Sequence, residues 1–109
     1  MTDTTENIVV LITAANEEEG AKLAKTLVEA RLAACVSLLS QARSFFWWEG
    51  KLDEQHETLM IMKTRRHVLP QLIETVQKNH SYAVPEIIAL PIIDGASNYL
   101  NWLAIEVKP

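Results

Sequence analysis

The stretch Cys35–Thr64, CVSLLSQARSFFWWEGKLDEQHETLMIMKT, decides the fold of this 109-residue chain. It consists of two long runs of β-forming residues that meet at the tetrapeptide WEGK, residues 48–51, and no proline interrupts either run. A gap of about two residues with one glycine between such runs predicts a β-hairpin. Each predicted strand is much longer than the usual length of about five or six residues. The aromatic residues at 45–48 exceed what one small sheet face can bury, which indicates that the hairpin packs against another chain.

A strand and a helix are predicted before the hairpin. The run Ile8–Ile12 is continuously apolar, as expected of a strand covered on both faces. Asn16 is a favourable N-cap, and the acidic residues 17–19 suit the first turn of a helix. Glu19 stands where a capping box needs it. We expect this helix to end near Arg31.

A helix, a strand and a short last helix are predicted after the hairpin. Apolar residues at helical spacing place the second helix from near Leu69 to about Asn79. The β-forming run 86–92 follows as a fourth strand. Ser97 or Asn98 can cap the final helix.

The order βαββαβ plus a C-terminal helix is the split pattern of ferredoxin-like domains, an α+β fold. Residues 1–6 are expected to form a disordered lead, and residues 7–109 a single domain. Both main helices should cover one face of a four-stranded antiparallel sheet. The third predicted strand is apolar on both faces, however, with Leu59 on one and Met60 on the other. An apolar sheet face without helices predicts burial by a neighbouring subunit.

Composition excludes several functional classes. The net charge is −4 and the basic residues are scattered, so the broad basic face that nucleic acids need is absent. Cys35 is the single cysteine, so an intramolecular disulfide is impossible. No run approaches the roughly eighteen apolar residues of a membrane span, and the first residues lack the pattern of a signal peptide. These features predict a cytoplasmic protein that binds neither nucleic acid nor membranes.

Three motifs resemble one known family. They are WEGK at 48–51, His80-x-Tyr82-x-x-Pro85-Glu86-Ile87, and Leu90-Pro91. At this spacing they resemble the CutA family of divalent-cation tolerance proteins, over about residues 8–103. The resemblance implies a ferredoxin-like subunit in a tight, PII-like homotrimer. It also implies a role in tolerance of copper and other divalent metals.

The chain departs from the family pattern at Ile12, Asn79, Ser81 and Ala83. Members proposed to bind copper carry Cys where Ile12 stands, and a His pair where this chain has Asn79-His80. Of that set only His80 remains. The resemblance therefore implies, at most, weak binding of a divalent cation such as Cu²⁺ or Zn²⁺.

His80 is the candidate metal ligand, because it follows a helix C-terminus where the dipole favours a cation. Capping of that helix end is the alternative role. The chain lacks the paired spacings of His and Cys typical of metal sites. Met60 and Met62 could act as soft Cu(I) donors, but core packing is the more usual role of such residues. The remaining candidate donors are Cys35, His56 and His67.

A cleft is the second candidate site. Its residues would gather if the hairpin tip reaches the loop after the second helix, in the same or the adjacent subunit; they are Trp48, Glu49, Lys51, Tyr82 and Glu86. Aromatic walls with a few charged groups suit a small-molecule pocket. The alternative is that these groups fix the trimer interface.

Two functions follow from these sites. One is a trimeric divalent-cation tolerance protein that binds metal weakly. The other is a PII-like signalling or scaffold module that senses a small, for example anionic, ligand in the intersubunit cleft. No enzyme activity is expected, because Ser81 and His80 are sequence neighbours without an orienting third group.

Overall fold

The computed structural model describes residues 6–109, so the expected disordered lead lies outside the described residues, apart from Glu6. The elements are β1 (Asn7–Ala14), α1 (Glu17–Glu29), β2 (Cys35–Trp48), β3 (Lys51–Arg65), a 3₁₀ turn (Arg66–Val68), α2 (Leu69–Asn79), β4 (Ile87–Pro91) and α3 (Ser97–Glu106). This order confirms the predicted βαββαβ pattern with a final helix. No helix within the described range is long and apolar enough to cross a membrane.

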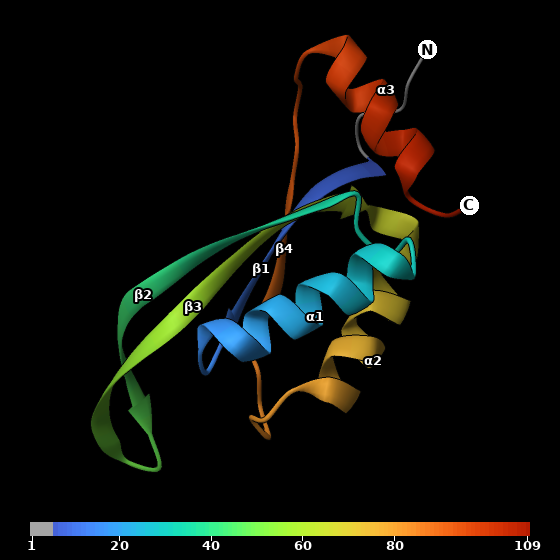
Figure 1. Ribbon diagram of the computed structural model, residues 1–109. Helices are drawn as coiled ribbons and strands as arrows, with labels where there is room; N and C mark the ends of the chain where they lie inside the picture. The colour runs from blue at the N-terminus through green and yellow to red at the C-terminus, as the bar shows by residue number, and fades with distance from the viewer. Residues whose placement is uncertain (1–5) are drawn as a thin grey trace.

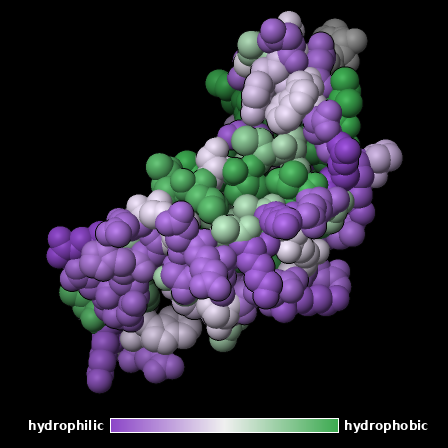
Figure 2. All heavy atoms as spheres, in the orientation of Figure 1, coloured by the Kyte–Doolittle hydropathy of each residue, from purple (hydrophilic) through white to green (hydrophobic). Residues whose placement is uncertain are grey.

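The four strands form one antiparallel sheet in the order β2-β3-β1-β4. In Figure 1, α1 and α2 lie side by side over one face of this sheet, and α3 lies at the end of the sheet where β1 begins. Seen from the helices' side, Figure 2 shows mostly hydrophilic spheres, with hydrophobic ones gathered in a band across the middle. The buried hydrophobic residues of the two helices, Leu23 and Leu27 of α1 and Leu72 and Val76 of α2, belong to the core.

The two faces of the sheet differ because side chains alternate along each strand. On the helix-covered face, Val10, Ile12 and Met60 are fully buried and belong to the core. On the opposite face, which we call the helix-free face, the register places Leu11 between Ile61 and Ile88. Those side chains are only partly buried or exposed. The sheet is thus apolar on both sides, as the sequence predicted.

The β2–β3 hairpin extends past α1 and α2 and curls at its far end (Figure 1). Its turn residues, Glu49 and Gly50, have φ angles of 50° and 78°. Positive φ at both positions is typical of the type I′ turn that suits a two-residue hairpin. A register shift between Leu39 and Ala42 interrupts the β2–β3 ladder, with Gln41 at φ 64°. Such a bulge increases local twist and bends the strand pair.

The helix ends follow the predicted capping chemistry with two corrections. The Asn16 side chain accepts a hydrogen bond from the Glu19 N–H at 2.8 Å, as expected of an N-cap. The Glu19 carboxylate, however, accepts from the N–H of Ala15 and not from that of Asn16. The capping box is therefore displaced by one residue. At α3 the N-cap is Ala96, without a side-chain cap, so neither Ser97 nor Asn98 plays that role.

Candidate functional site

A pocket of about 770 Å³ lies between the curled half of the hairpin and the segment that follows α2. Its lining comes from four parts of the chain: Thr13 and Ala15; Ser44, Phe45, Phe46 and Trp48; Asp53, Gln55 and Glu57; Tyr82, Ala83, Val84 and Glu86. A volume of several hundred Å³ is typical of small-molecule sites. The hairpin tip therefore reaches the loop after the second helix within one chain.

Strand register explains which hairpin residues line the pocket. Ser44 pairs with Gln55, and Phe46 pairs with Asp53, so these side chains share one face of the hairpin. Glu57 lies two and four residues from Gln55 and Asp53, hence on the same face. That face continues the helix-free face of the sheet. The pocket and the uncovered apolar surface are therefore neighbours on one side of the molecule.

The charged groups of the pocket are all acidic. Three carboxylates, Asp53, Glu57 and Glu86, belong to the lining, and no lysine, arginine or histidine does. Arg43 lies on the opposite side of the hairpin, where it pairs with Glu54. Within residues 6–109 the lining therefore supplies no basic partner for the small anionic ligand suggested from the sequence.

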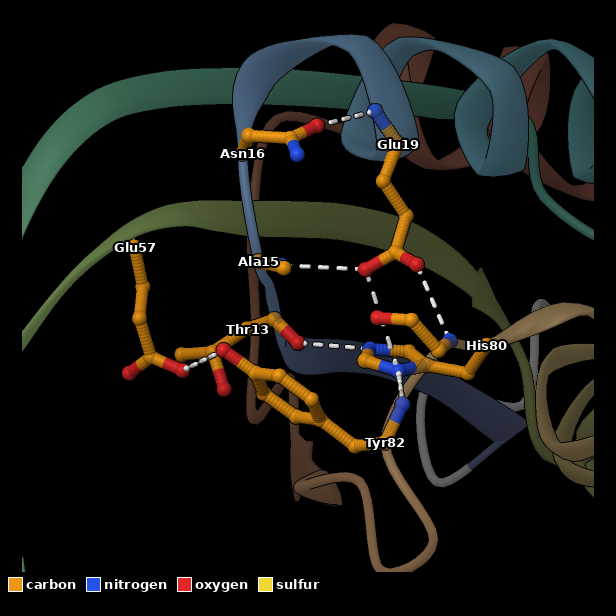
Figure 3. Close-up of polar contacts among 8 residues, drawn as sticks. Thr13, Ala15, Asn16, Glu19, Glu57, His80 and Tyr82 are labelled. Atoms are coloured by element: carbon orange, nitrogen blue, oxygen red, sulfur yellow. Dashed lines mark hydrogen bonds and ion pairs between the residues drawn. The ribbon is translucent and has the colours of Figure 1, made fainter.

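Glu57 is the most buried of these carboxylates, with 6% of its surface exposed. Its Oε2 accepts a hydrogen bond from the Tyr82 hydroxyl at 2.9 Å, as Figure 3 shows. Burial of the phenol, together with the hydrogen bond to Glu57 and its negative charge, raises the pKa of Tyr82 to about 12. Within residues 6–109, Glu57 has no salt bridge. A buried carboxylate therefore faces the pocket without a positive partner.

A second polar network, centred on Glu19, holds the loop that supplies Tyr82 (Figure 3). One carboxylate oxygen accepts from the Ala15 N–H, and the other accepts from the Ser81 N–H, each at 2.9 Å. Burial alone would raise the pKa of Glu19, but the hydrogen bonds from Ala15 and Ser81 and the nearby His80 outweigh it and hold that pKa below its usual value. The network ties the start of α1 to the end of α2.

His80 lies in the same network with its side chain fully buried. Its Nδ1 accepts the N–H of Tyr82 at 3.0 Å, so Nε2 carries the proton and donates to the Thr13 carbonyl at 2.8 Å. The nearest carboxylate oxygen, of Glu19, lies 3.8 Å from Nδ1. Both ring nitrogens are therefore already used, and in this chain the imidazole positions the Tyr82 loop.

The structure gathers three of the five residues predicted for the cleft. Trp48, Tyr82 and Glu86 line the pocket. Glu49 belongs to the exposed turn, and Lys51 is the exposed first residue of β3, so neither lines it.

The candidate metal donors are dispersed. Met60 and Met62 are fully buried core residues, and His56 is exposed on the outer side of the hairpin. His67 donates a hydrogen bond from Nε2 to the Lys108 carbonyl at 2.8 Å. Cys35 is a partly buried free thiol. Among residues 6–109, no three His, Cys, Asp or Glu side chains come close enough together to hold a metal ion.

Sequence reasoning missed Glu57, Asp53 and Glu19 as site residues. For Glu57 a signal existed, because its parity with Leu59 and Ile61 in β3 places it on the helix-free face. Its burial depends on the curl of the hairpin, which residue patterns do not reveal. Glu19 was missed because helix capping already explained it in the sequence. Its hydrogen bond from the Ser81 N–H joins segments 62 residues apart, which local patterns do not predict.

The family model and the similar proteins described here all carry the name CutA or CutA1. Residues 8–106 match the family described as CutA1 divalent ion tolerance protein. The divalent-cation tolerance protein CutA of Thermus thermophilus is 48% identical over 95 residues, which cover 87% of this chain and 92% of that one. The chloroplastic protein CutA of Arabidopsis thaliana is 48% identical over 100 residues, or 92% of this chain, which spans about half (55%) of that longer protein.

A solved structure agrees with the fold. The crystal structure of CutA1 from Oryza sativa superposes with a TM-score of 0.93 at 45% identity and covers 96% of each chain. The match confirms the ferredoxin-like architecture with its long hairpin over nearly the whole chain.

Proposed function

This chain belongs to the CutA1 divalent ion tolerance family, and on that premise we propose that it takes part in the response to divalent cations as a homotrimer that binds them weakly. Family membership carries this proposal, since relatives 43–48% identical are named for divalent-cation tolerance. The role is non-catalytic in this proposal. Its support is that His80 bonds to Thr13 and Tyr82, while Ser81 bonds to Glu19, so the two side chains do not form a nucleophile and base.

The apolar helix-free face supports the homotrimer. Ile88 and Leu90 of β4 are 51% and 47% exposed, and Leu39 of β2 is 53% exposed, although all three are apolar residues of one sheet. Contiguous apolar surface of this kind is typical of a subunit interface. The threefold arrangement itself comes from the family resemblance.

A metal ion would bind weakly because the residues of one chain do not fit a resident metal site. His80 must give up the Tyr82 N–H before Nδ1 is free to bind an ion, and Glu19 is the carboxylate nearest that nitrogen. Breaking a buried hydrogen bond opposes binding by about 1–3 kcal/mol. We therefore propose a weak Cu²⁺ or Zn²⁺ interaction, completed by water or by side chains of other copies.

Isothermal titration calorimetry with Cu²⁺ and Zn²⁺ tests this proposal. His80→Gln should abolish the weak binding, whereas His56→Gln, a matched change at an exposed histidine of the hairpin, should leave it unchanged. Circular dichroism checks that both variants keep the fold. Tight binding that persists in His80→Gln would place the ligands elsewhere in the chain.

A second candidate function is favoured by the pocket itself. We propose that it binds a small molecule and that the trimer reports its presence, as a sensing or scaffold module. The supporting observation is a 770 Å³ pocket with aromatic and acidic walls beside the apolar helix-free face. Thermal-shift screening separates the two functions: stabilisation by metals alone favours the first, and stabilisation by organic ligands, lost in Trp48→Ala, favours the second.

The cytoplasm remains our proposal for the location of this protein. It rests on the sequence composition, while names of relatives include a chloroplastic form and, for a 40% identical solved structure from Archaeoglobus fulgidus, a periplasmic one. Cell fractionation with antibody detection tests it, and recovery in a membrane or secreted fraction would contradict it.

A further inference from the structure

The charge of the pocket defines the class of molecule that it fits. Its three carboxylates come from two places, Asp53 and Glu57 on β3 and Glu86 just before β4. Within residues 6–109 no basic side chain belongs to the lining, so the ionisable side chains around the pocket are all acidic. A negative, partly enclosed site attracts cations and repels anions.

Glu57 gives the strongest indication of a missing positive charge. The residue is 94% buried, yet within residues 6–109 its side chain has one polar partner, the hydroxyl of Tyr82. A buried charge without a counter-charge is costly, and proteins normally pair it. By contrast Glu54, its neighbour on the outer face of the hairpin, is paired with Arg43 although it is far more exposed. The pocket therefore holds an unpaired carboxylate where the solvent-facing side holds a paired one.

The aromatic walls add a second, independent indication. Phe46, Trp48 and Tyr82 line the pocket, and aromatic rings attract organic cations through their negative faces. The same hairpin already shows this kind of contact, where the Arg43 guanidinium lies 4.9 Å from the centre of the Phe45 ring. Rings together with carboxylates suit a cation that also carries an apolar body.

The size of the pocket and the spacing of its carboxylates favour an organic cation over a bare metal ion. A divalent metal needs several oxygen or nitrogen ligands around one point, and no group of three such residues exists within residues 6–109. A pocket of about 770 Å³ with spaced carboxylates instead fits an extended molecule.

We propose that this pocket binds an organic cation, a primary ammonium or guanidinium on an apolar body, with Glu57 as the main charge partner and Trp48 and Tyr82 against the body. Asp53 and Glu86 add negative charge at the walls of the pocket. This inference rests on the second proposed function, that the pocket is a ligand site. It names the ligand class, and it applies to the 109-residue chain in its native assembly.

Three probes with one phenylethyl body and different charges test the inference. They are 2-phenylethylammonium, the neutral 2-phenylethanol and the anionic 3-phenylpropionate. Each is titrated into the 109-residue protein, and binding is followed by Trp fluorescence and NMR chemical shifts. The ammonium probe should bind about tenfold or more tightly than the neutral probe, as expected of a charge-assisted hydrogen bond. The anion should bind weakest.

Matched variants locate the charge partner. Glu57→Gln keeps an oxygen that can accept from Tyr82 and removes the charge, so the ammonium probe should lose about tenfold in affinity while the alcohol does not. Glu54→Gln, on the outer face of the same strand, is the control and should change neither. Because a buried change can disturb folding, Asp53→Asn provides a second test at a less buried wall, with a smaller loss expected. Circular dichroism and oligomer mass are measured for all three.

The other outcomes distinguish the proposal that the pocket is a ligand site from the proposal that its ligand is an organic cation. If the alcohol or the anion binds best, the pocket is a ligand site but the cation assignment is wrong. If none of the probes binds and a crystal structure shows a lysine or arginine of a neighbouring copy against Glu57, the pocket is an assembly contact and both proposals fail. Equal binding of the ammonium probe to parent and Glu57→Gln would also overturn the inference.

Discussion

The two faces of the sheet share the same strands but differ in what completes them. On the helix-covered face, alternate residues of β1 and β3 are fully buried by α1, α2 and α3, as Val10 and Met62 are. On the helix-free face, their sequence neighbours Leu11 and Ile61 are almost as apolar but remain only partly buried. The helices of the same chain bury one face, whereas the chain leaves the other face partly exposed.

Along the hairpin, the residues on the helix-free face change from apolar to acidic and aromatic. Near its base, the helix-free face carries apolar residues suited to another subunit. Beyond the bulge at residues 39–42, the same face carries Asp53 and Glu57 with aromatic neighbours and forms the pocket. The bulge thus separates the surface that we propose for assembly from the pocket that we propose as a ligand site.

The largest effect is expected from the helix-covered face. Met60→Ala removes a fully buried core side chain and should lower the free energy of unfolding by about 2–5 kcal/mol. Because the helices of the same chain cover Met60, the loss should appear at every protein concentration. Denaturant unfolding at two concentrations measures it, and a loss below about 1 kcal/mol would show that this face is not the core.

Truncation at the hairpin tip should act on assembly more than on the fold. Trp48 is 49% exposed within the chain, so the remaining area is available to a neighbouring copy. Trp48→Ala should weaken the trimer by about 1–2 kcal/mol per subunit while far-ultraviolet circular dichroism stays unchanged. Trp47→Ala, at the adjacent, more exposed tryptophan, is the comparison. If the Trp48→Ala protein stays trimeric on dilution as the parent does, Trp48 does not contribute to assembly and only lines the pocket.

The Tyr82–Glu57 bond gives a smaller effect with a defined pH range. Tyr82→Phe leaves the buried Glu57 carboxylate without its hydrogen bond and should cost about 1–3 kcal/mol near neutral pH. The pKa of Tyr82 is about 12 in the folded protein, above its value of 10.0 in an unperturbed tyrosine. The stabilisation is therefore complete below pH 10 and is lost as the pH rises towards 12.

Thermal unfolding of parent and Tyr82→Phe across this range checks the sign. The advantage of the parent should shrink steadily above about pH 10, where the unfolded phenol ionises first. An advantage that grows with pH would mean that Tyr82 does not donate to Glu57.

The smallest effect is expected at Glu19. The pKa of its carboxyl is lowered in the folded protein, so its contribution is present above the unfolded value of 4.5 and is lost as the pH falls through the folded pKa. Glu19→Gln should remove this part of the acid dependence and cost about 0.5–1.5 kcal/mol at neutral pH. Urea unfolding between about pH 3 and pH 7 measures both quantities. An identical acid dependence in parent and variant would contradict the network around Ser81.

Much of the fold could be predicted because it depends on local patterns. The hairpin, the N-cap Asn16 and both main helices follow from alternation, capping chemistry and helical spacing. The pocket depended on the curl of β2 and β3, which the bulge near Gln41 helps to set without a glycine or proline signal. Trp48 and Tyr82 were predicted to meet on the condition that the hairpin tip reaches the loop after the second helix, and both line the pocket. Glu57 was missed because its burial arises from tertiary structure.

Sedimentation equilibrium of the 109-residue protein most directly tests the central claim, which is that other copies of the chain cover the helix-free face. At low micromolar concentration we expect a mass near three times 12.3 kDa. Ile61→Lys, which places a charge on that face, should give the mass of one chain with the fold retained, whereas a lysine at exposed Ile105 of α3 should leave the larger mass unchanged. A parent protein that sediments as a single 12.3 kDa chain would contradict the account.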